Sequence, residues 1–548
     1  MNRIEEELRK LLSVCGVSGT SGERDMGLFL EERVRAIPYF AKHSDCIYRI
    51  PVPNDPLDRF CVAALLESDT DSRDCVIITG HYDVVGVEEY GMAAPYATNP
   101  DALETILALE ELPAGARSDL QSGSWLFGRG SADMKYGIAL CLDQLREFAA
   151  EKESGRLKGN LLFLGVCSEE TNSEGMRSAC SFLVQLQKEK KLDYIAMCLT
   201  ECHEIDEREP DTHWIQLGSC GKIMPFFYCI GKTTHAREPF EGLDANAINA
   251  AVYRRMQLNP DFVEHAHGQS SPPPICLHME DRRARYSVSM PEKAVSYYNL
   301  ITLCAEPERI LEKLEKIAQA ALQEALCERN EKYRAYRIRI GETKTGDLPA
   351  PQVLTYRTLL RMARQKGIHI SNTDLKLHSQ EKSTAKDVLS DGIHIQEQAI
   401  RQVERLIHAL SLEGPLVVTG FLPPYYPNVF PQASDLRNQR LLRCVEDICH
   451  EAQAEGVRLF TKNYFMGISD LCYSGLGEQD CSLIFQNLVT HTSYYSFPIE
   501  ALRKLNIPGV NVGGYGKDIH KREERLERSF NFTILPVYFH RLIERLFG

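Results

Sequence analysis

Residues 75–86 read C-V-I-I-T-G-H-Y-D-V-V-G, an apolar run that ends in a histidine and an aspartate two positions apart. A short apolar run closed by a glycine is typical of a buried strand. Because residues at i and i+2 of an extended segment point the same way, His81 and Asp83 are expected to share a face. Taken alone, the pair is either a metal ligand with its orienting carboxylate or a polar pair satisfied at a strand end.

Similar apolar runs predict three more buried strands, at 160–166, 194–199 and 508–512. Apolar residues recur at helical steps over 134–152, and the opening segments 4–14 and 25–36 have the same spacing. Strands that alternate with helices predict an α/β domain with a central, largely parallel sheet flanked by helices.

The pattern changes near residue 218, where a small α+β domain is predicted to begin. Its expected strands lie at 223–230, 294–303 and 336–340, and its expected helices at 246–257 and 307–326. The stretch 341–352 is interpreted as the linker out of this domain. Helices are predicted again at 353–364 and 396–410, followed by a strand at 415–424, whereas the polar stretch 367–392 has no assignable pattern.

We therefore expect a catalytic domain in two parts. Residues 1–217 form its first part, residues 347–548 form its second part with extra helices, and residues 218–346 are inserted between them. A chain of 548 residues is too long for a single core, so this division is consistent with its length.

The composition excludes several classes of protein. The formal net charge of −13 argues against a nucleic-acid partner. The first residues are too charged for a secretory signal, and no apolar run approaches the roughly 20 residues that span a bilayer, so no membrane partner is expected. The 18 cysteines include no C-x-x-C pair and are interpreted as free thiols in a reducing cytoplasm.

Histidines and acidic residues stand where the predicted strands end or where a helix begins. They are His81, Asp133, Glu169, Glu170, Glu201 and His520. In open α/β sheets, ligands bind at the carboxyl ends of the strands. Four strands that each deliver such a side chain indicate a functional site.

Each residue also has an ordinary structural explanation. Asp133 could cap the helix at 134–152, Glu169 and Glu170 could be a solvated loop edge, and His520 could be a surface residue of a charged segment. The stretch G-R-G-S-A-D before this helix lacks the third glycine of a dinucleotide-binding loop. Four further histidines are interpreted as solvent-exposed or packing residues, namely His203, His213, His265 and His267.

Two histidines and three carboxylates together are typical ligands of a metal site. Zinc binds imidazole nitrogen and carboxylate oxygen, and catalytic zinc sites leave one position open. The set supplies enough ligands for two ions if one carboxylate bridges them. The glutamate of the pair that is not needed as a ligand is then placed to act as a general base.

Four motifs in this order carry a resemblance to a known family: G-H-Y-D-V-V, G-R-G-S-A-D-M-K-Y-G, C-S-E-E-T-N-S-E-G and G-G-Y-G-K-D-I-H-K-R-E-E. They closely resemble the di-zinc metallopeptidases of peptidase family twenty, which includes acetylornithine deacetylase, succinyl-diaminopimelate desuccinylase, aminoacylases and carboxypeptidases. The chain looks most like the branch of the arginine-utilisation protein RocB. The resemblance implies a zinc-exopeptidase-like catalytic domain interrupted by an inserted α+β lid domain that mediates dimerisation.

The resemblance also implies a role for individual residues. Asp133 would bridge two zinc ions, with His81 and Glu201 completing one ion and Glu170 and His520 the other. Glu169 would be the general base, and Asp83 would hold His81 in the right tautomer. In the lid domain, His235 would reach the active site, and the substrate-binding residues would be Asn299, Ser469 and Asp470.

The expected function is metal-dependent hydrolysis of an amide bond in a small substrate, an N-acyl amino acid or short peptide, by zinc-activated water with Glu169 as base. The enzyme would be an exopeptidase or deacylase of amino-acid metabolism and arginine utilisation. Two Zn²⁺ ions are expected, with Co²⁺ or Mn²⁺ as alternatives. The expected partner is a second copy bound through the lid. The alternative is a non-catalytic descendant that binds a peptide or partner in the same cleft.

Overall fold

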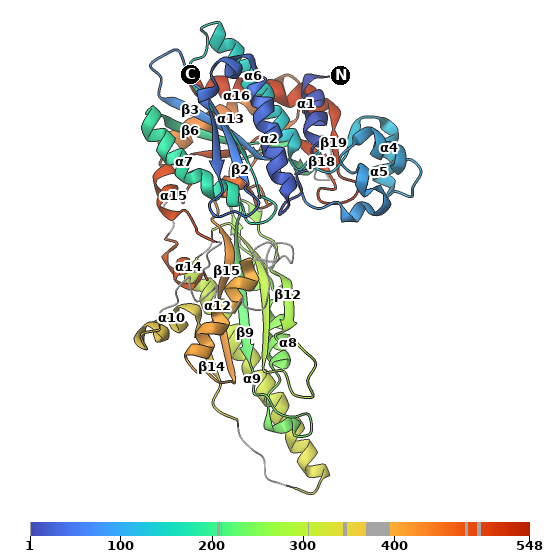
Figure 1. Ribbon diagram of the computed structural model, residues 1–548, viewed down its shortest axis with the longest axis vertical. Coiled ribbons are helices and arrows are strands. Elements are labelled where there is room, and N and C mark those ends of the chain that lie inside the picture. Colours follow the sequence, from blue (N-terminus) through green and yellow to red (C-terminus); the bar gives the residue numbers. More distant parts are fainter. Residues whose placement is uncertain are drawn as a thin grey trace. The chain divides into compact units, whose positions relative to one another are not determined.

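The computed structural model describes residues 2–204, 209, 211–304, 306–342, 348–368, 395–476, 480–489 and 495–548 (Figure 1). The chain forms two compact units. The first unit contains Met1–Cys220, Val429–Gly477 and Pro498–Gly548, and the second contains Gly221–Asn428 and Glu478–Phe497.

The first unit is built on an eight-stranded sheet. In spatial order its strands are β1 (Ile47–Pro51), β2 (Phe60–Leu66), β5 (Asn160–Val166), β3 (Asp74–His81), β6 (Asp193–Leu199), β17 (Gly509–Asn511), β8 (His213–Gln216) and β16 (Leu459–Lys462). The four central strands β5, β3, β6 and β17 run parallel. The predicted α/β fold with a largely parallel sheet is confirmed.

Helices pack against the central parallel strands and against the antiparallel strands at one end of this sheet, because the apolar face of each helix must be buried. Helices α6 and α16 contact β3, and α13 contacts β6, whereas α2 and α7 pack against the antiparallel strands β1 and β2. The α-helices of the unit are α1 (Arg3–Leu12), α2 (Ser21–Arg35), α3 (Pro38–Lys42), α4 (Pro100–Leu107), α5 (Ala114–Ser122), α6 (Lys135–Glu153), α7 (Glu174–Lys190), α13 (Leu436–Ala454), α15 (Ile499–Leu505) and α16 (Leu535–Phe547). Its shorter helical turns are η1 (Ser44–Cys46), η2 (Glu88–Tyr96), η5 (Asp470–Tyr473) and η6 (Phe530–Ile534).

A second, four-stranded sheet of this unit joins segments that are distant in the sequence. Its order is β4 (Trp125–Phe127), β19 (Arg525–Glu527), β18 (Tyr515–Lys517) and β7 (His203–Glu204). The antiparallel pairing of β4 with β19 sets Phe127 opposite Arg525. The loops that precede Asp133 and follow His520 are thereby brought together.

The second unit has a five-stranded sheet. Its order is β12 (Ile275–Asp281), β13 (Lys293–Thr302), β9 (Gly221–Ile230), β15 (Leu416–Tyr426) and β14 (Gln352–Thr355), antiparallel except for the pair β14 and β15. The remaining elements are α8 (Ala245–Met256), α9 (Pro307–Arg339), α10 (Tyr356–Gln365), α12 (Ile395–Ala409), α14 (Ser482–Asn487), the hairpin β10 (His265–Ala266) and β11 (Gln269–Ser270), and the turns η3 (Pro239–Glu241) and η4 (Pro260–Phe262). Apolar residues of β9, β15, α10 and α12 form one buried core.

Two secondary-structure predictions in this region are wrong. The strand predicted at 336–340 is the end of α9, which continues to Arg339 and is anchored there by stacking of Tyr333 on Phe240, with ring centroids 4.9 Å apart. The helix predicted from residue 353 begins at Tyr356, because residues 352–355 pair with β15 as strand β14.

The inserted domain is also longer than the predicted 218–346. It extends to Asn428, because β14 and β15 complete the sheet of the second unit. The later segment Glu478–Phe497 also belongs to this unit. The sequence missed this extension because β14 has only four residues and is recognisable as a strand only through its pairing with β15. Most of the stretch 367–392 lies outside the described residues.

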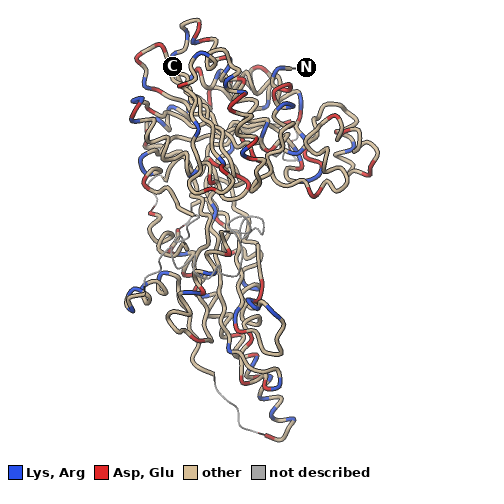
Figure 2. The backbone as a smooth tube through the Cα atoms, in the orientation of Figure 1, with Lys and Arg blue, Asp and Glu red and all other residues tan. Residues whose placement is uncertain are grey.

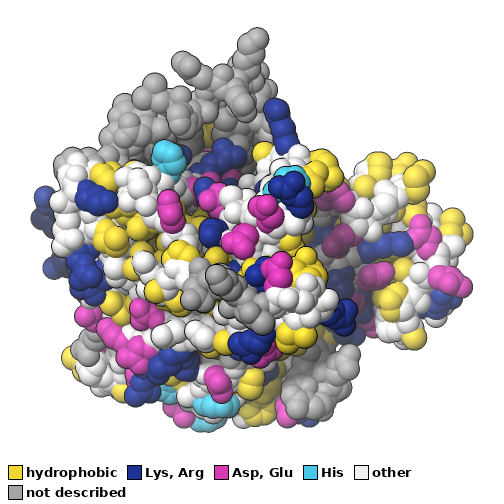
Figure 3. All heavy atoms as spheres, turned by 90° about the horizontal axis from the view of Figure 1, so that it is seen from below, with side chains coloured by type: hydrophobic (Ala, Val, Ile, Leu, Met, Phe, Trp, Pro, Cys, Tyr) yellow, Lys and Arg dark blue, Asp and Glu magenta, His cyan; other side chains and the backbone are white. Residues whose placement is uncertain are grey.

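Charged residues of both signs are interspersed along the chain (Figure 2). Figure 3 shows the same mixture on one face, where apolar side chains lie between basic and acidic ones. None of the helices in the described residues is both long and apolar enough to cross a membrane.

Candidate metal centre

The carboxyl ends of the central parallel strands converge on one edge of the large sheet. His81 is the last residue of β3, Glu169 and Glu170 follow β5, and Glu201 follows β6. Because β5, β3 and β6 are parallel neighbours, these side chains emerge from the same edge.

A first cluster, defined as His81, Asp133 and Glu201, lies at this edge. Nε2 of His81 is 3.1 Å from Oδ1 of Asp133 and 3.5 Å from Oε2 of Glu201. All three side chains are buried. One donor atom from each residue lies within 4.8 Å of the others, which is close enough to share one metal ion.

A second cluster, defined as Asp133, Glu170 and His520, shares one residue with the first. Nε2 of His520 is 2.9 Å from Oδ2 of Asp133 and 3.1 Å from Oε2 of Glu170. Asp133 therefore presents one oxygen to each histidine. The five residues that the sequence analysis named as metal ligands are brought together in this arrangement.

The donor set has the character of a site for divalent cations. Burial and the neighbouring Asp133 raise the pKa of Glu201 to about 8 and also raise the pKa of Glu170. The Oε1 atom of Glu170 is buried and has no hydrogen-bond partner among the described residues. The side chains of Asp133, Glu170 and Glu201 thus lie close together, and one of their oxygens lacks a hydrogen-bond donor among the described residues. Together with the two histidines, they fit the ligands of two divalent cations.

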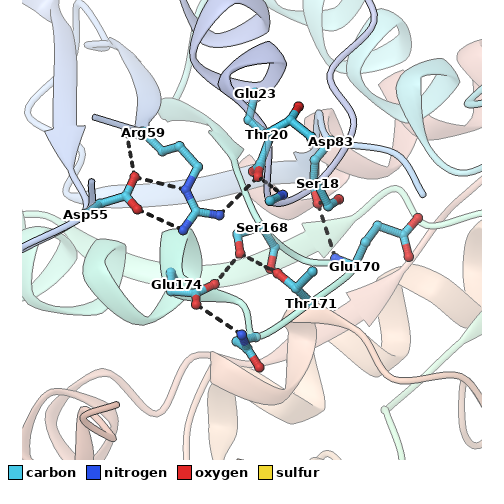
Figure 4. Close-up of polar contacts among 12 residues, drawn as sticks. Ser18, Thr20, Glu23, Asp55, Arg59, Asp83, Ser168, Glu170, Thr171 and Glu174 are labelled. Atoms are coloured by element: carbon cyan, nitrogen blue, oxygen red, sulfur yellow. Dashed lines mark hydrogen bonds and ion pairs between the residues drawn. The ribbon is translucent and has the colours of Figure 1, made fainter. Parts of the chain in front are cut away.

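Asp83, two residues after His81, holds the backbone of the glutamate pair; Figure 4 shows it beside Ser18 and Glu170. Its carboxylate accepts a hydrogen bond from Ser18 Oγ at 2.6 Å, and from the backbone N–H groups of Glu169 and Glu170 at 3.2 Å each. Burial opposes a charge on Asp83, but contacts with His81 and Ser18 outweigh it and lower its pKa. The carboxylate is thus kept ionised and positions two neighbouring strand ends.

Ser18 was not identified from the sequence, and its loop is held by a second buried network (Figure 4). Glu23 accepts hydrogen bonds from Gly19 N at 2.6 Å and from Arg59 Nη1 at 3.0 Å. Arg59 also pairs with Asp55. The turn-rich G-V-S-G-T-S-G signals a loop but does not show that its serine meets Asp83.

Glu169 stands beside the clusters without belonging to either. Its Oε2 atom is 3.9 Å from Nε2 of His81. Burial raises the pKa of Glu169 well above its usual range, although the neighbouring His81 opposes this. A carboxylate in this position is near any water or substrate that reaches the clusters, which is what its predicted role as base requires.

The predicted substrate-binding residues of the first unit are both buried. Ser469 Oγ is 2.9 Å from Ser219 Oγ. Burial raises the pKa of Asp470 to about 7, whereas His81 and a hydrogen bond with Ser173 oppose this rise. The contact of either residue with a substrate stays a prediction.

The other two predicted site residues belong to the second unit. His235 is exposed, and its Nδ1 accepts a hydrogen bond from Arg237 N at 3.1 Å. Asn299 lies in β13, where its Oδ1 is buried without a hydrogen-bond partner among the described residues. Their roles toward the metal clusters stay predictions.

Comparison with known proteins identifies the family. The pattern of Peptidase family M20/M25/M40 matches residues 77–505, more than half of the chain. The chain belongs to this family. Its members are metal-dependent hydrolases, and the matched segment contains four of the five candidate ligands, with His520 just beyond it.

The chain is also similar to individual members along most of its length. It is 28% identical to Protein RocB of Bacillus subtilis, over 98% of this chain and 93% of RocB. It is 31% identical to the uncharacterized protein YqjN of the same organism, over 96% of this chain and 93% of YqjN. The solved structure of the M20 family metallo-carboxypeptidase Sso-CP2 from Sulfolobus solfataricus matches 100% of this chain and 99% of its own, with a TM-score of 0.53 at 12% identity. The predicted resemblance to this family and to the RocB branch is confirmed.

Proposed function

We propose that this protein hydrolyses an amide bond in a small substrate, an N-acyl amino acid or a short peptide, with the help of two zinc ions. The single observation that carries the proposal is the pair of His–carboxylate clusters that share Asp133. Glu169 lies beside them and belongs to neither. This arrangement supports two cation positions with a base next to them.

His81, Asp133 and Glu201 would hold one ion, and Asp133, Glu170 and His520 the other. When bound, such ions act as Lewis acids that polarise a carbonyl and make water more acidic. Co²⁺ or Mn²⁺ could replace Zn²⁺, because oxygen-rich ligand sets select weakly among divalent ions.

The chain's own contribution centres on Glu169. Its carboxylate would take a proton from the attacking water and return it to the leaving nitrogen, so that one residue serves both proton transfers. Asp83 fixes the backbone of Glu169 through the hydrogen bond at 3.2 Å and so holds the base in place. We propose that His235, Asn299, Ser469 and Asp470 contact the substrate.

The second unit supports the proposal of a homodimer. Its edge strand β12 exposes Ile275, Leu277 and Met279, whose exposed fractions are 43%, 45% and 41%. An apolar edge strand is a ready template for another chain. Light scattering of wild type and a Leu277→Lys variant tests this proposal, because the substitution should shift the protein toward monomer.

All 18 cysteines lie in the described part of the chain, and none forms a disulfide. This supports the proposed location in a reducing cytoplasm. A role in amino-acid metabolism and arginine utilisation is proposed from the resemblance to the RocB branch.

The experiment that tests the function has two measurements. Purified protein is analysed for metal, and a series of N-acyl amino acids and dipeptides is screened for hydrolysis with added Zn²⁺, Co²⁺ or Mn²⁺. We expect two equivalents of metal and hydrolysis of one substrate class, which would separate a deacylase from an exopeptidase. Protein that binds two equivalents and hydrolyses nothing favours the non-catalytic alternative, and protein that binds none overturns the proposal.

A further inference from the structure

A buried ion pair lies next to the second cluster and contributes no ligand to it. Arg129 Nη1 and Glu524 Oε2 are 2.5 Å apart, and the two residues are 1% and 0% exposed. Removing two charges from water is costly, and a buried pair is weak evidence for a gain in stability. The other contacts of the two side chains show what the pair does.

Glu524 fixes the backbone of Asp133, the residue shared by both clusters. Its second oxygen, Oε1, accepts hydrogen bonds from the N–H groups of Ala132 at 3.1 Å and Asp133 at 3.2 Å. Glu524 itself comes four residues after His520 in the sequence. A side chain from the His520 segment thus holds the amide of the bridging aspartate.

Arg129 makes the reciprocal connection. Its Nη2 donates a hydrogen bond to the backbone carbonyl of His520 at 3.2 Å, and its Nε donates to the carbonyl of Gly86 at 3.2 Å. Arg129 comes four residues before Asp133. A side chain from the Asp133 segment thus holds the backbone of the histidine ligand.

The backbone of His520 needs such support. Its φ is +64°, in the left-handed region that residues other than glycine seldom adopt. Strained backbone persists where the surrounding structure enforces it. The hydrogen bond from Arg129 is one such restraint, and it acts on the residue whose ring reaches Asp133.

The two segments are placed beside each other by the small sheet. Strand β4 pairs with β19, and Gly128 N donates to the backbone carbonyl of Glu524 at 3.1 Å. Arg129 and Glu524 therefore leave the sheet side by side. The same pairing brings the segments of Asp133 and His520 to one point.

We propose that Arg129 and Glu524 are reciprocal positioning residues for the second cluster, each holding the backbone of the metal ligand on the other segment. The inference rests on the proposed function, in which this cluster holds a cation. Loss of either side chain should weaken the second metal position more than the first, because the pair supports two ligands of the second cluster, Asp133 and His520, and only Asp133 of the first.

The test compares two variants at the pair with a matched control elsewhere in the same unit. Arg129→Lys keeps the charge but cannot contact Glu524, His520 and Gly86 together. Glu524→Gln keeps the shape and removes the charge. The control is Glu7→Gln, which removes the buried charge that pairs with Arg33 of α2 and Arg146 of α6 at 2.7 Å each. Neither arginine is a candidate ligand.

Each metal-free protein is titrated with Co²⁺, whose visible absorption reports ligand geometry, and its melting temperature is measured in parallel. We expect about 10–100-fold weaker binding of one Co²⁺ equivalent, with an altered spectrum, in both pair variants. The other equivalent should lose clearly less affinity, because only one of its three ligands, Asp133, is held by the pair. Glu7→Gln should lower the melting temperature and leave both equivalents unchanged.

Three results would overturn the inference. The first is wild-type binding of both Co²⁺ equivalents by folded pair variants, which would leave the proposed function intact. The second is failure of both pair variants to fold while Glu7→Gln folds, which would make the pair purely structural. The third is wild-type protein that binds no Co²⁺, which would remove the proposed function as well.

Discussion

Nε2 of His81 lies 3.1 Å from Oδ1 of Asp133, while Nδ1 of the same ring lies 3.1 Å from the backbone carbonyl oxygen of Asp83. A carbonyl oxygen can only accept, so Nδ1 carries a proton. In the neutral ring, Nε2 then has a lone pair that can bind a cation. In the charged ring, Nε2 carries a second N–H that faces Asp133. Burial opposes the charged ring, but contacts with Asp133, Asp83 and Glu201 outweigh it and raise the pKa of His81 well above its usual range.

Metal binding at pH 7 should therefore release protons. In the metal-free protein the pKa of His81 is raised well above its usual range, and contacts with Asp133 and Glu170 raise the pKa of His520 to about 11, so we expect both rings to carry a charge. Both rings must lose a proton to become ligands, and so must Glu201, whose pKa is about 8. Two equivalents of Zn²⁺ should therefore displace about three protons. The measurement is calorimetric titration in buffers of different ionisation enthalpy.

Its control is the same titration of His520→Gln, which should release about one proton fewer. The affinity should also fall as the pH is lowered, because protons compete for the same nitrogens. A heat of binding that does not vary between buffers would contradict this assignment of protonation states.

Replacement of Glu169 by glutamine should separate chemistry from metal binding. Glutamine keeps the shape of the side chain but cannot take up a proton, so turnover should fall by about 10²–10⁴-fold. The metal content should stay at the wild-type value, because Glu169 belongs to neither cluster. Glu153→Gln, at the exposed end of α6, is the matched control and should retain full turnover. Unchanged turnover in Glu169→Gln would show that another group is the base.

Replacement of Ser18 by alanine should weaken the first metal position from a distance. The variant loses the hydrogen bond of 2.6 Å to Asp83, which leaves a buried carboxylate short of a donor. We expect about ten-fold weaker Zn²⁺ binding, measured by competition with a chromophoric chelator. Ser13→Ala removes an exposed hydroxyl that donates a hydrogen bond to the carbonyl of Lys10, and it should leave the affinity unchanged. Equal Zn²⁺ affinities in the two variants would show that Ser18 does not support the first metal position.

The sequence was sufficient where a local pattern determines the structure. Strand β3 is a continuous apolar run closed by glycine, and α6 has apolar residues at helical steps. Strand β14 could not be predicted in this way, because four residues become a strand only by pairing with β15, more than sixty positions away. The end of α9 was missed because residues 336–340 read Y-R-I-R-I, an apolar–polar alternation that is typical of a strand. Packing of Tyr333 on Phe240 instead stabilises this end of the helix.

The same distinction applies to the candidate site. His81 and Glu201 could be named because they stand at strand ends, where the residue type alone is informative. Ser18, Arg129 and Glu524 act by holding the backbone or side chain of another site residue. Such a role leaves no local signal, since it depends on segments up to several hundred residues apart meeting in space.

The last prediction concerns pH and His213, whose ring stacks on Phe530 with centroids 3.5 Å apart. Burial lowers the pKa of His213 to about 4, with Asp211 opposing, whereas the unfolded chain has the usual pKa near 6.5. The unfolded state thus binds more protons between these values, so this stabilisation is present above pH 6.5 and is lost as the pH falls toward 4. Between pH 7 and pH 5 the free energy of unfolding should fall by about 1–2 kcal/mol through this group.

The drop in melting temperature over this interval should therefore be smaller in His213→Phe, which keeps the stacking, than in wild type. His450→Gln, at an exposed position of α13, should behave as wild type, and equal drops in all three proteins would refute the argument.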